Sequence, residues 1–171
     1  LRKWMKSKRF VIGIEDNKPD AIAKLREAFA GDTSVEVLPL PSIYPQGAKQ
    51  VLLYNVTGQV VKGGQRLASL GVIIINVSSL AKLAQYMEDG MPLIDRIVTV
   101  DGSAVKEAKN LVAPIGTPIE HLFEQAGGLN CEPGKVLIGG PMLGIAVKSM
   151  SEPTQKATNA ILAMTEKEAK T

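Results

Sequence analysis

Residues 97–129 read IVTVDGSAVKEAKNLVAPIGTPIEHLFEQAGGL, and this stretch decides the fold of the second half of the chain. Its first residues alternate between apolar and polar, which is typical of a half-buried β-strand. Asp101-Gly102 then indicates a tight turn, because glycine tolerates the positive φ that such turns require. A second strand is predicted at residues 111–113, where Pro114 and Gly116 close it.

The same stretch continues into one short predicted helix. Thr117 is a candidate N-cap, with Pro118 at the first helical position and Glu120 three residues after the cap, as in a capping box. An apolar face follows, and Gly127-Gly128 ends the helix. Two strands that deliver one helix onto a small sheet form the core of a β-grasp, so we predict that fold for this half.

The composition is that of a soluble globular protein, with 45% hydrophobic and 22% charged residues among 171. The net charge of +3 is small, and five of the cations fall within residues 1–9, so nucleic acid is not an expected partner. Aromatic residues are only 4%, which leaves few platforms for base stacking. We find no apolar run near eighteen residues and therefore predict no transmembrane segment.

Cys131 and His121 are the only cysteine and the only histidine. One residue of each kind excludes an intramolecular disulfide and a self-contained zinc or iron–sulfur site. We accordingly predict no metal ligands in this chain. It begins at Leu1 without an initiator methionine, in what looks like the last turns of a helix, so we expect an excised piece of a longer protein.

The first half of the chain predicts a parallel α/β layer. Strands are expected at residues 9–14, 35–38 and 71–75, and helices follow them at about residues 17–29, 48–56 and 78–89. Short connections between alternating strands and helices are typical of a parallel sheet. The fold class is therefore α/β, or α+β overall, with a partial parallel Rossmann-like layer followed by the β-grasp.

The sequence predicts a domain boundary near residue 92, where the composition and the strand pattern change, and it divides into three segments. Residues 1–92 form the α/β domain, and residues 93–150, with polar-alternating strands and closer turns, form the β-grasp domain. Residues 151–171 supply a returning strand at residues 159–164 and a charged tail, expected to lead towards a domain outside this chain.

Two positions in the first half are candidate ligand contacts. Tyr44-Pro45-Gln46-Gly47 lies where a loop enters a helix, and the backbone N–H groups there are suited to an anion such as phosphate. The alternative is an ordinary turn into the helix. Asn76 ends a predicted parallel strand, where ligands of open α/β sheets bind. The alternative is that its amide satisfies the following turn.

The remaining polar candidates favour structural roles. Glu15-Asp16 is either an acid/base or metal-facing pair, or an offset to the positive end of the next helix. Gly139-Gly140 indicates tight packing more than ligand approach. His121 and Cys131 have no partner pattern that activates them. We therefore predict no catalytic residues.

Six motifs, in order, carry a resemblance that covers nearly the whole chain: IGIEDNKPDAI, YPQG, GVIIINV, PLIDRIVTVDGSAV, APIGTPIEHLFEQAGG and IGGPMLGIA. The chain resembles RnfC, a subunit of the bacterial Rnf electron-transport complex. It is more distantly similar to the NADH-oxidising flavin subunit of respiratory complex I and to the cobalamin reductase of propanediol-utilising microcompartments.

The resemblance implies that residues 93–150 are a soluble-ligand-binding β-grasp (SLBB) domain and residues 1–92 the second half of a flavin and NADH domain. It implies a cytoplasmic protein, peripheral on the inner face of the plasma membrane. The parent passes electrons between NADH and ferredoxin, coupled to ion pumping. Its partners are the other subunits of the complex. FMN and [4Fe-4S] clusters belong to the full-length parent, and this piece alone is expected to hold no cofactor.

The resemblance also implies flavin-side contacts. Tyr44 and Gly47 fall on the loop that lines the isoalloxazine and phosphate, and Asn76 and Ser79 fall on the strand end that follows. The chain departs from the family at Lys49, where the family shows an acidic residue. That change reverses a charge in a nucleotide site and leaves NADH oxidation by the parent open.

Three functional hypotheses follow. The first is an inactive piece of an oxidoreductase subunit that serves as a scaffold and docking domain between a flavin and a cluster domain. The second is a β-grasp module that binds a cobalamin-like or glycan ligand without electron transfer, or else a cobalamin-reductase-like subunit. The third is a protein-binding adaptor within the complex.

Overall fold

The computed structural model of the chain describes residues 6–170. It divides into two compact units, Leu1–Ile74 and Ile75–Thr171, and each is described by itself. Most of the predicted N-terminal helix end, residues 1–5, lies outside the described residues. The composition predicts a boundary near residue 92, later than this division, and the three predicted domain ranges stay predictions.

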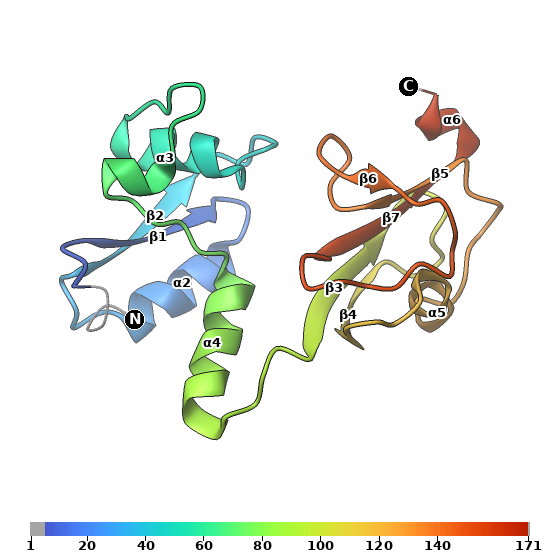
Figure 1. The fold of residues 1–171 in the computed structure, drawn as a ribbon, viewed down its shortest axis with the longest axis horizontal. Coiled ribbons are helices and arrows are strands. Elements are labelled where there is room, and N and C mark those ends of the chain that lie inside the picture. The colour runs from blue at the N-terminus through green and yellow to red at the C-terminus, as the bar shows by residue number, and fades with distance from the viewer. Residues whose placement is uncertain (1–5, 171) are drawn as a thin grey trace. The chain divides into compact units, whose positions relative to one another are not determined.

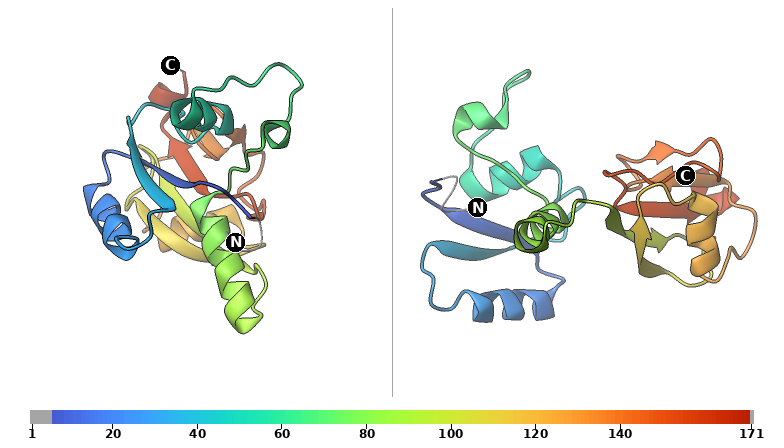
Figure 2. Two further views of the ribbon diagram at one scale, coloured as in Figure 1. Left: turned by 90° about the vertical axis from the view of Figure 1, so that its left-hand side faces the viewer. Right: turned by 60° about the horizontal axis from the view of Figure 1, so that its bottom comes forward.

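The first unit contains a parallel two-stranded sheet with a helix on each side. Strands β1 (Phe10–Glu15) and β2 (Val35–Leu40) pair in register from Phe10↔Val35 to Glu15↔Leu40. Helices α2 (Pro19–Ala28) and α3 (Lys49–Thr57) cover opposite faces of this sheet (Figures 1 and 2). The predicted parallel α/β arrangement is therefore confirmed for these two strands and two helices.

Gly13 allows α3 to approach the sheet closely. A Cβ atom at this position would lie 2.8 Å from Leu52 Cδ1 and 3.0 Å from Leu40 Cδ1. The neighbouring helical residue Leu53 is 1% exposed. The glycine in β1 thus leaves room for the side chains of Leu52 and Leu40, which would have to shift to accommodate a Cβ atom.

The predicted third strand, residues 71–75, is wrong. This segment has no regular secondary structure and is not part of the sheet, and it follows a short 3₁₀ helix, η1 (Leu67–Leu70). Ile73 is 62% exposed. An apolar run becomes a strand only where another strand pairs with it, and no such partner exists among the described residues.

The second unit is a five-stranded mixed sheet, as predicted for the β-grasp. Its spatial order is β4-β3-β7-β5-β6, with β3 and β7 parallel at the centre. The remaining neighbours are antiparallel. The elements in chain order are α4 (Val77–Asp89), β3 (Asp95–Asp101), β4 (Lys109–Pro114), α5 (Ile119–Gln125), β5 (Lys135–Ile138), β6 (Ile145–Ala146), β7 (Ala160–Met164) and α6 (Glu166–Ala169).

The core of the second unit lies between the sheet and α5. Alternate residues of β3, Val98 and Val100, are fully buried, as is Ile161 of β7. Leu122 and Phe123 of α5 pack in the same cluster. The predicted amphipathic pattern of residues 97–129 is thus confirmed, because the period-2 face of the strand meets the apolar face of the helix.

The predicted capping box does not form. Pro118, not Thr117, is the N-cap residue of α5, and it supplies no side-chain bond. Thr117 Oγ1 instead donates to the carbonyl of Pro114 at 2.7 Å. The N–H groups of Ile119 and Glu120 donate to the carbonyls of Glu152 (3.1 Å) and Met150 (3.0 Å). A distant chain segment thus caps the helix, and local sequence carries no sign of it.

Candidate flavin-facing site

The loop between β2 and α3 lies at the carboxyl edge of the parallel sheet, where ligands of open α/β sheets bind. It carries Tyr44 and Gly47, two of the four predicted contacts, and both are exposed. The loop closes as Ala48 N–H donates to the Pro45 carbonyl at 2.9 Å. The structure therefore brings Tyr44 and Gly47 together at one edge of the first unit.

The N-terminus of α3 follows this loop and is suited to an anion. Its N-cap residue, Ala48, has no side chain that accepts a hydrogen bond, and the first turn contains no acidic residue. Lys49 begins the helix and is exposed. Backbone N–H groups and the helix dipole give the start of α3 a positive potential, and the first residue of the helix is a lysine.

Gln46 is a candidate that sequence reasoning did not single out. Its side chain is 5% exposed. Its Nε2 has no hydrogen-bond partner in the part of the chain that the structure describes. Buried amide donors are almost always satisfied, so an unpaired one beside an anion-compatible helix end indicates a position for a ligand acceptor. The motif YPQG contained the residue, but burial cannot be seen in a four-residue motif.

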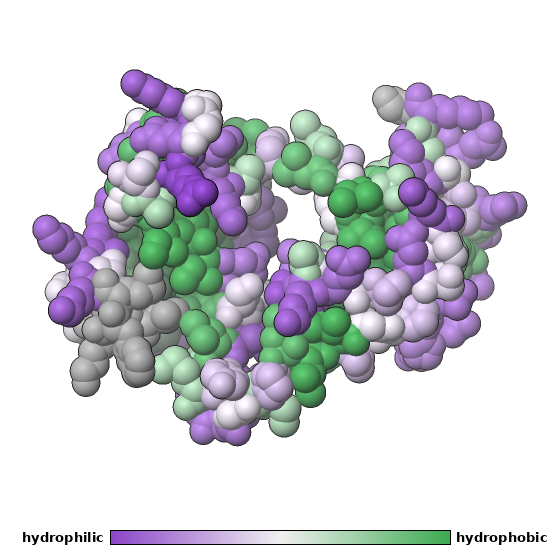
Figure 3. All heavy atoms as spheres, in the orientation of Figure 1, coloured by the Kyte–Doolittle hydropathy of each residue, from purple (hydrophilic) through white to green (hydrophobic). Residues whose placement is uncertain are grey.

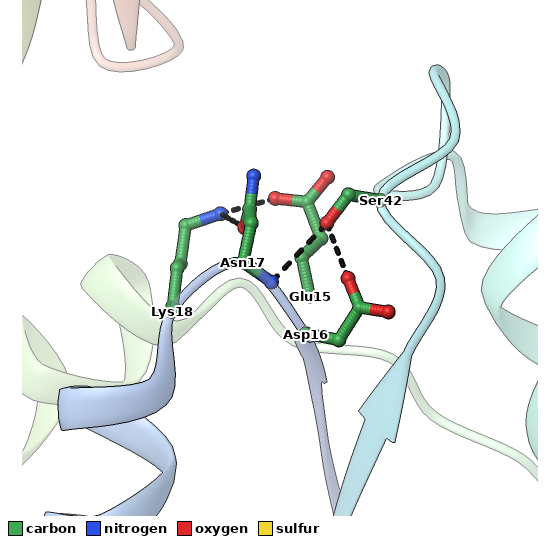
Figure 4. A network of polar contacts seen from close by, with 5 residues as sticks. All are labelled: Glu15, Asp16, Asn17, Lys18 and Ser42. Atoms are coloured by element: carbon green, nitrogen blue, oxygen red, sulfur yellow. Dashed lines mark hydrogen bonds and ion pairs between the residues drawn. The ribbon is translucent and has the colours of Figure 1, made fainter.

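Glu15 and Asp16 are held by neighbouring residues, as Figure 4 shows. Glu15 forms an ion pair with Lys18. Asp16 Oδ1 accepts a hydrogen bond from Ser42 Oγ at 2.7 Å, and Asn17 N–H donates to the same hydroxyl at 3.3 Å. These contacts join the ends of β1 and β2 ahead of α2, and they favour the structural interpretation over acid/base chemistry.

Asn76 and Ser79 lie in the second unit, at the start of α4. Asn76 is the N-cap residue of α4, and its Oδ1 accepts a hydrogen bond from Ser78 N–H at 2.9 Å. Ser79 is half-buried in the first turn. The four predicted contacts therefore fall into two pairs, one in each unit. This N-cap hydrogen bond is a local structural role, as in the alternative given above, in which the Asn76 side chain satisfies the backbone that follows it.

The remaining candidates form no centre. His121 Nδ1 lies 3.1 Å from Glu124 Oε2 on the exposed side of α5, and Cys131 is also exposed. Within residues 6–170, no group of three or more His, Cys, Asp or Glu side chains is placed to hold a metal ion. None of the helices in the same range combines the length and the apolar character that a membrane span requires.

Two family models match this chain. Residues 1–85 match the Nuo51 FMN-binding domain, and residues 97–146 match the SLBB domain. The two matches follow one another in the predicted order, a segment similar to the FMN-binding domain first and the SLBB match second.

Curated relatives match nearly the whole chain, and those named here are all C subunits of Rnf-type complexes. The chain is 39% identical over 165 residues to that of the proton-translocating ferredoxin:NAD⁺ oxidoreductase complex of Clostridium ljungdahlii, covering 96% of this chain and 36% of the relative. It is 41% identical over 159 residues to that of the Na⁺-translocating complex of Acetobacterium woodii, covering 93% and 36%. It is 38% identical over 168 residues to that of the ion-translocating oxidoreductase complex of Yersinia enterocolitica, covering 98% and 24%. The chain thus spans about a quarter to a third of these relatives.

The residues of the first unit fit a phosphate-bearing flavin. Gln46 offers a buried, unpaired amide donor, and the N-terminus of α3 with Lys49 offers positive potential for the phosphate. A Cβ atom built on Gly47 would meet nothing within 4 Å, so the space above the loop is open. FMN, when bound, supplies hydride and single-electron chemistry.

Proposed function

We propose, because this chain is a homologue of RnfC, that it supplies one wall of the flavin site of such a protein and links it to the SLBB domain. The observation that carries the proposal is the buried Gln46 amide, whose Nε2 is unpaired among the described residues, in the loop before α3. The residues of that loop fall within the match to the FMN-binding domain.

Each residue of this wall has a distinct task in the proposal. Gln46 donates from Nε2 to an acceptor atom of the flavin, and the N–H groups at the start of α3 bind the phosphate. Tyr44 and Gly47 line the open side of the loop. Asn76 and Ser79 stay flavin-side contacts on the strength of the resemblance alone.

The whole parent protein passes electrons between NADH and ferredoxin through flavin and [4Fe-4S] clusters in this proposal. It acts with the other subunits of a membrane complex, as a peripheral protein on the cytoplasmic face. This chain is the scaffold between the two redox domains. Lys49 makes the entrance more positive than an acidic residue would, so the parent is expected to favour anionic groups there.

The piece alone is expected to hold flavin weakly, because it provides only one wall. The test is to purify the 171-residue chain and titrate it with FMN and, separately, with riboflavin, following flavin fluorescence. We expect a colourless preparation that binds FMN at least about 10-fold more tightly than riboflavin, since charge-assisted hydrogen bonds contribute about 1.5–3 kcal/mol. Equal affinities would contradict the phosphate assignment, and a yellow preparation would contradict the single-wall proposal.

Two variants sharpen the test. Gln46→Met keeps the volume of the side chain and removes the donor, so it should weaken FMN and riboflavin alike. Lys49→Gln removes the charge and should weaken FMN only. Lys24→Gln, at an exposed position of α2, serves as the control and should change neither affinity.

A further inference from the structure

Strand β4 forms one edge of the five-stranded sheet in the second unit, because β3 is its only neighbour in that sheet among the described residues (Figure 1). An edge strand directs half of its backbone N–H and C=O groups away from the sheet, where an extended chain can pair with them. No residue of the flavin-facing loop belongs to β4. An inference about this edge therefore stands apart from the proposed flavin role.

The pairing of β3 with its two neighbours shows which groups of β4 point outward. Thr99 of β3 donates its N–H to the carbonyl of Asn159 at 3.0 Å, on the side of β7. Thr99 faces Asn110 of β4 in the ladder, so these two residues form a pair without hydrogen bonds, and the N–H and C=O groups of Asn110 point to the free edge. Bonded and non-bonded pairs alternate along an antiparallel ladder, so the groups of Val112 point the same way.

The open part of this edge is short and well defined. No other backbone group in residues 6–170 bonds to the outward N–H and C=O groups of Asn110 and Val112. The next outward residue, Pro114, has no N–H, and its carbonyl accepts a hydrogen bond from Thr117 N–H at 3.2 Å. At the other end the strand begins at Lys109. Residues 110–112 are therefore the segment of β4 that a further strand can reach.

The side chains beside this segment determine which sequence fits it. On the outer face of the sheet Val112 is 69% exposed, and its cross-strand neighbour Ile97 is 54% exposed. Figure 3 shows hydrophobic surface over the start of β3. The second outer pair is polar, because Thr99 Oγ1 donates to Asn110 Oδ1 at 2.7 Å. On the other face Leu111 packs against the core.

We propose that β4 binds an extended segment of a partner polypeptide as an additional, antiparallel strand. The outward groups of Asn110 and Val112 exchange hydrogen bonds with two residues of that segment, which stand two positions apart. The residue opposite Val112 is branched and apolar, and the residue opposite Asn110 is a threonine or serine, because matched cross-strand pairs stabilise a sheet. The residue between them lies beside Leu111 and is apolar.

A second copy of this chain fits the edge less well than a different polypeptide does. A two-fold antiparallel pair of β4 strands that uses both outward residues sets Asn110 of each copy opposite Val112 of the other. An amide then lies beside the exposed apolar pair of Val112 and Ile97 at both ends of the contact. A polypeptide that supplies an apolar residue at this point leaves no such mismatch.

The test titrates the ¹⁵N-labelled 171-residue chain with the blocked peptide acetyl-Lys-Ile-Leu-Thr-Glu-amide, whose Ile is designed to face Val112 and whose Thr is designed to face Asn110. The amide signals of Asn110 and Val112 should shift saturably, and their hydrogen exchange should slow at least about tenfold at saturation. Two methylated peptides are the matched controls. A methyl group on the Ile nitrogen removes a donor that faces β4 and should abolish the shifts, whereas one on the Leu nitrogen, which points away, should preserve them.

A variant of the chain tests the same bonds from the other side. Val112→Pro removes an outward N–H and no bond to β3, and proline is tolerated where the N–H of an edge strand faces solvent. It should abolish binding of the peptide, whereas Val112→Thr keeps the N–H and should preserve it. The two methylated peptides decide the question if Val112→Pro does not fold.

Three results would overturn the assignment. The first is the absence of any saturable shift with the unmethylated peptide. The second is equal binding of the two methylated peptides, or undiminished binding to folded Val112→Pro. The third is a shift of the Asn110 and Val112 signals with chain concentration in the absence of peptide, which would identify a second copy as the occupant.

Discussion

Replacing Gly102 by alanine should destabilise the second unit more than any other single methyl group added at a glycine there. Gly102 has φ +118°, and a Cβ atom on it would lie 2.2 Å from the carbonyl oxygen of Ala163 in β7. Ordinary contact requires the two backbones to separate by roughly an ångström. That movement strains the hydrogen bond from Ala104 N–H to the same carbonyl, now 3.0 Å.

The magnitude follows from two separable effects. Positive φ costs an alanine about 1–2 kcal/mol. The clash adds the penalty of an overpacked core, about 1–3 kcal/mol. Gly116→Ala is the matched control, because Gly116 has φ +100° and a Cβ atom there meets nothing within 4 Å. We therefore expect about 1–2 kcal/mol for Gly116→Ala and about 2–5 kcal/mol for Gly102→Ala.

Hydrogen exchange of the backbone amides of residues 97–101, measured in the intact chain, reports the stability of the second unit alone. Thermal melting of the whole chain does not separate the two units. The difference of about 2 kcal/mol between the variants corresponds to exchange about 30-fold faster in Gly102→Ala than in Gly116→Ala. Equal exchange rates in the two variants would refute the close approach of β7 to Gly102.

Three further predictions follow from single side chains. Arg96→Met should leave the free energy of unfolding unchanged or raise it in urea titrations, because a buried guanidinium with a neutral partner is replaced by an apolar side chain. A loss of about 3 kcal/mol or more would contradict this, because breaking a buried ion pair costs about 3–5 kcal/mol and a loss of that size would mean that the contact with Asn159 is an essential structural pair. Asn76→Ala should destabilise α4 by about 1 kcal/mol through loss of its N-cap, measured by exchange of α4 amides, and no change would contradict the cap. The Glu107 pKa should lie below its ordinary value of 4.5, because Lys109 donates a hydrogen bond to this carboxylate and its positive charge attracts the carboxylate. In the variant Lys109→Met the Glu107 pKa should rise, as measured by NMR titration. The lowered pKa means that this small stabilisation is present above pH 4.5 and is lost as the pH falls through the pKa of the folded state.

The second unit was predictable where a local pattern coincides with the packed face. Strand β3 alternates between buried and exposed residues along its length, because its period-2 sequence matches a sheet with one covered face. Helix α5 ends before Gly127-Gly128, as predicted. Each of these features is encoded within about ten residues of chain.

Features that depend on distant residues were not predictable. The segment at residues 71–75 has the composition of a strand, but pairing depends on a partner that composition does not reveal. The first N–H groups of α5 are bonded by Met150 and Glu152, far along the chain. Gln46 and Arg96 stand out only because tertiary packing buries them without satisfying every donor.

The amide signal of Gln46 Nε2 during FMN titration of the ¹⁵N-labelled chain is the measurement on which the flavin proposal depends. The unpaired amide donor should bond to the flavin, so its ¹H and ¹⁵N shifts should move saturably with FMN, and to a smaller extent with riboflavin at equal concentration. An Nε2 signal that stays fixed while other residues of the chain respond to FMN would contradict the assignment of this loop as one wall of a flavin site.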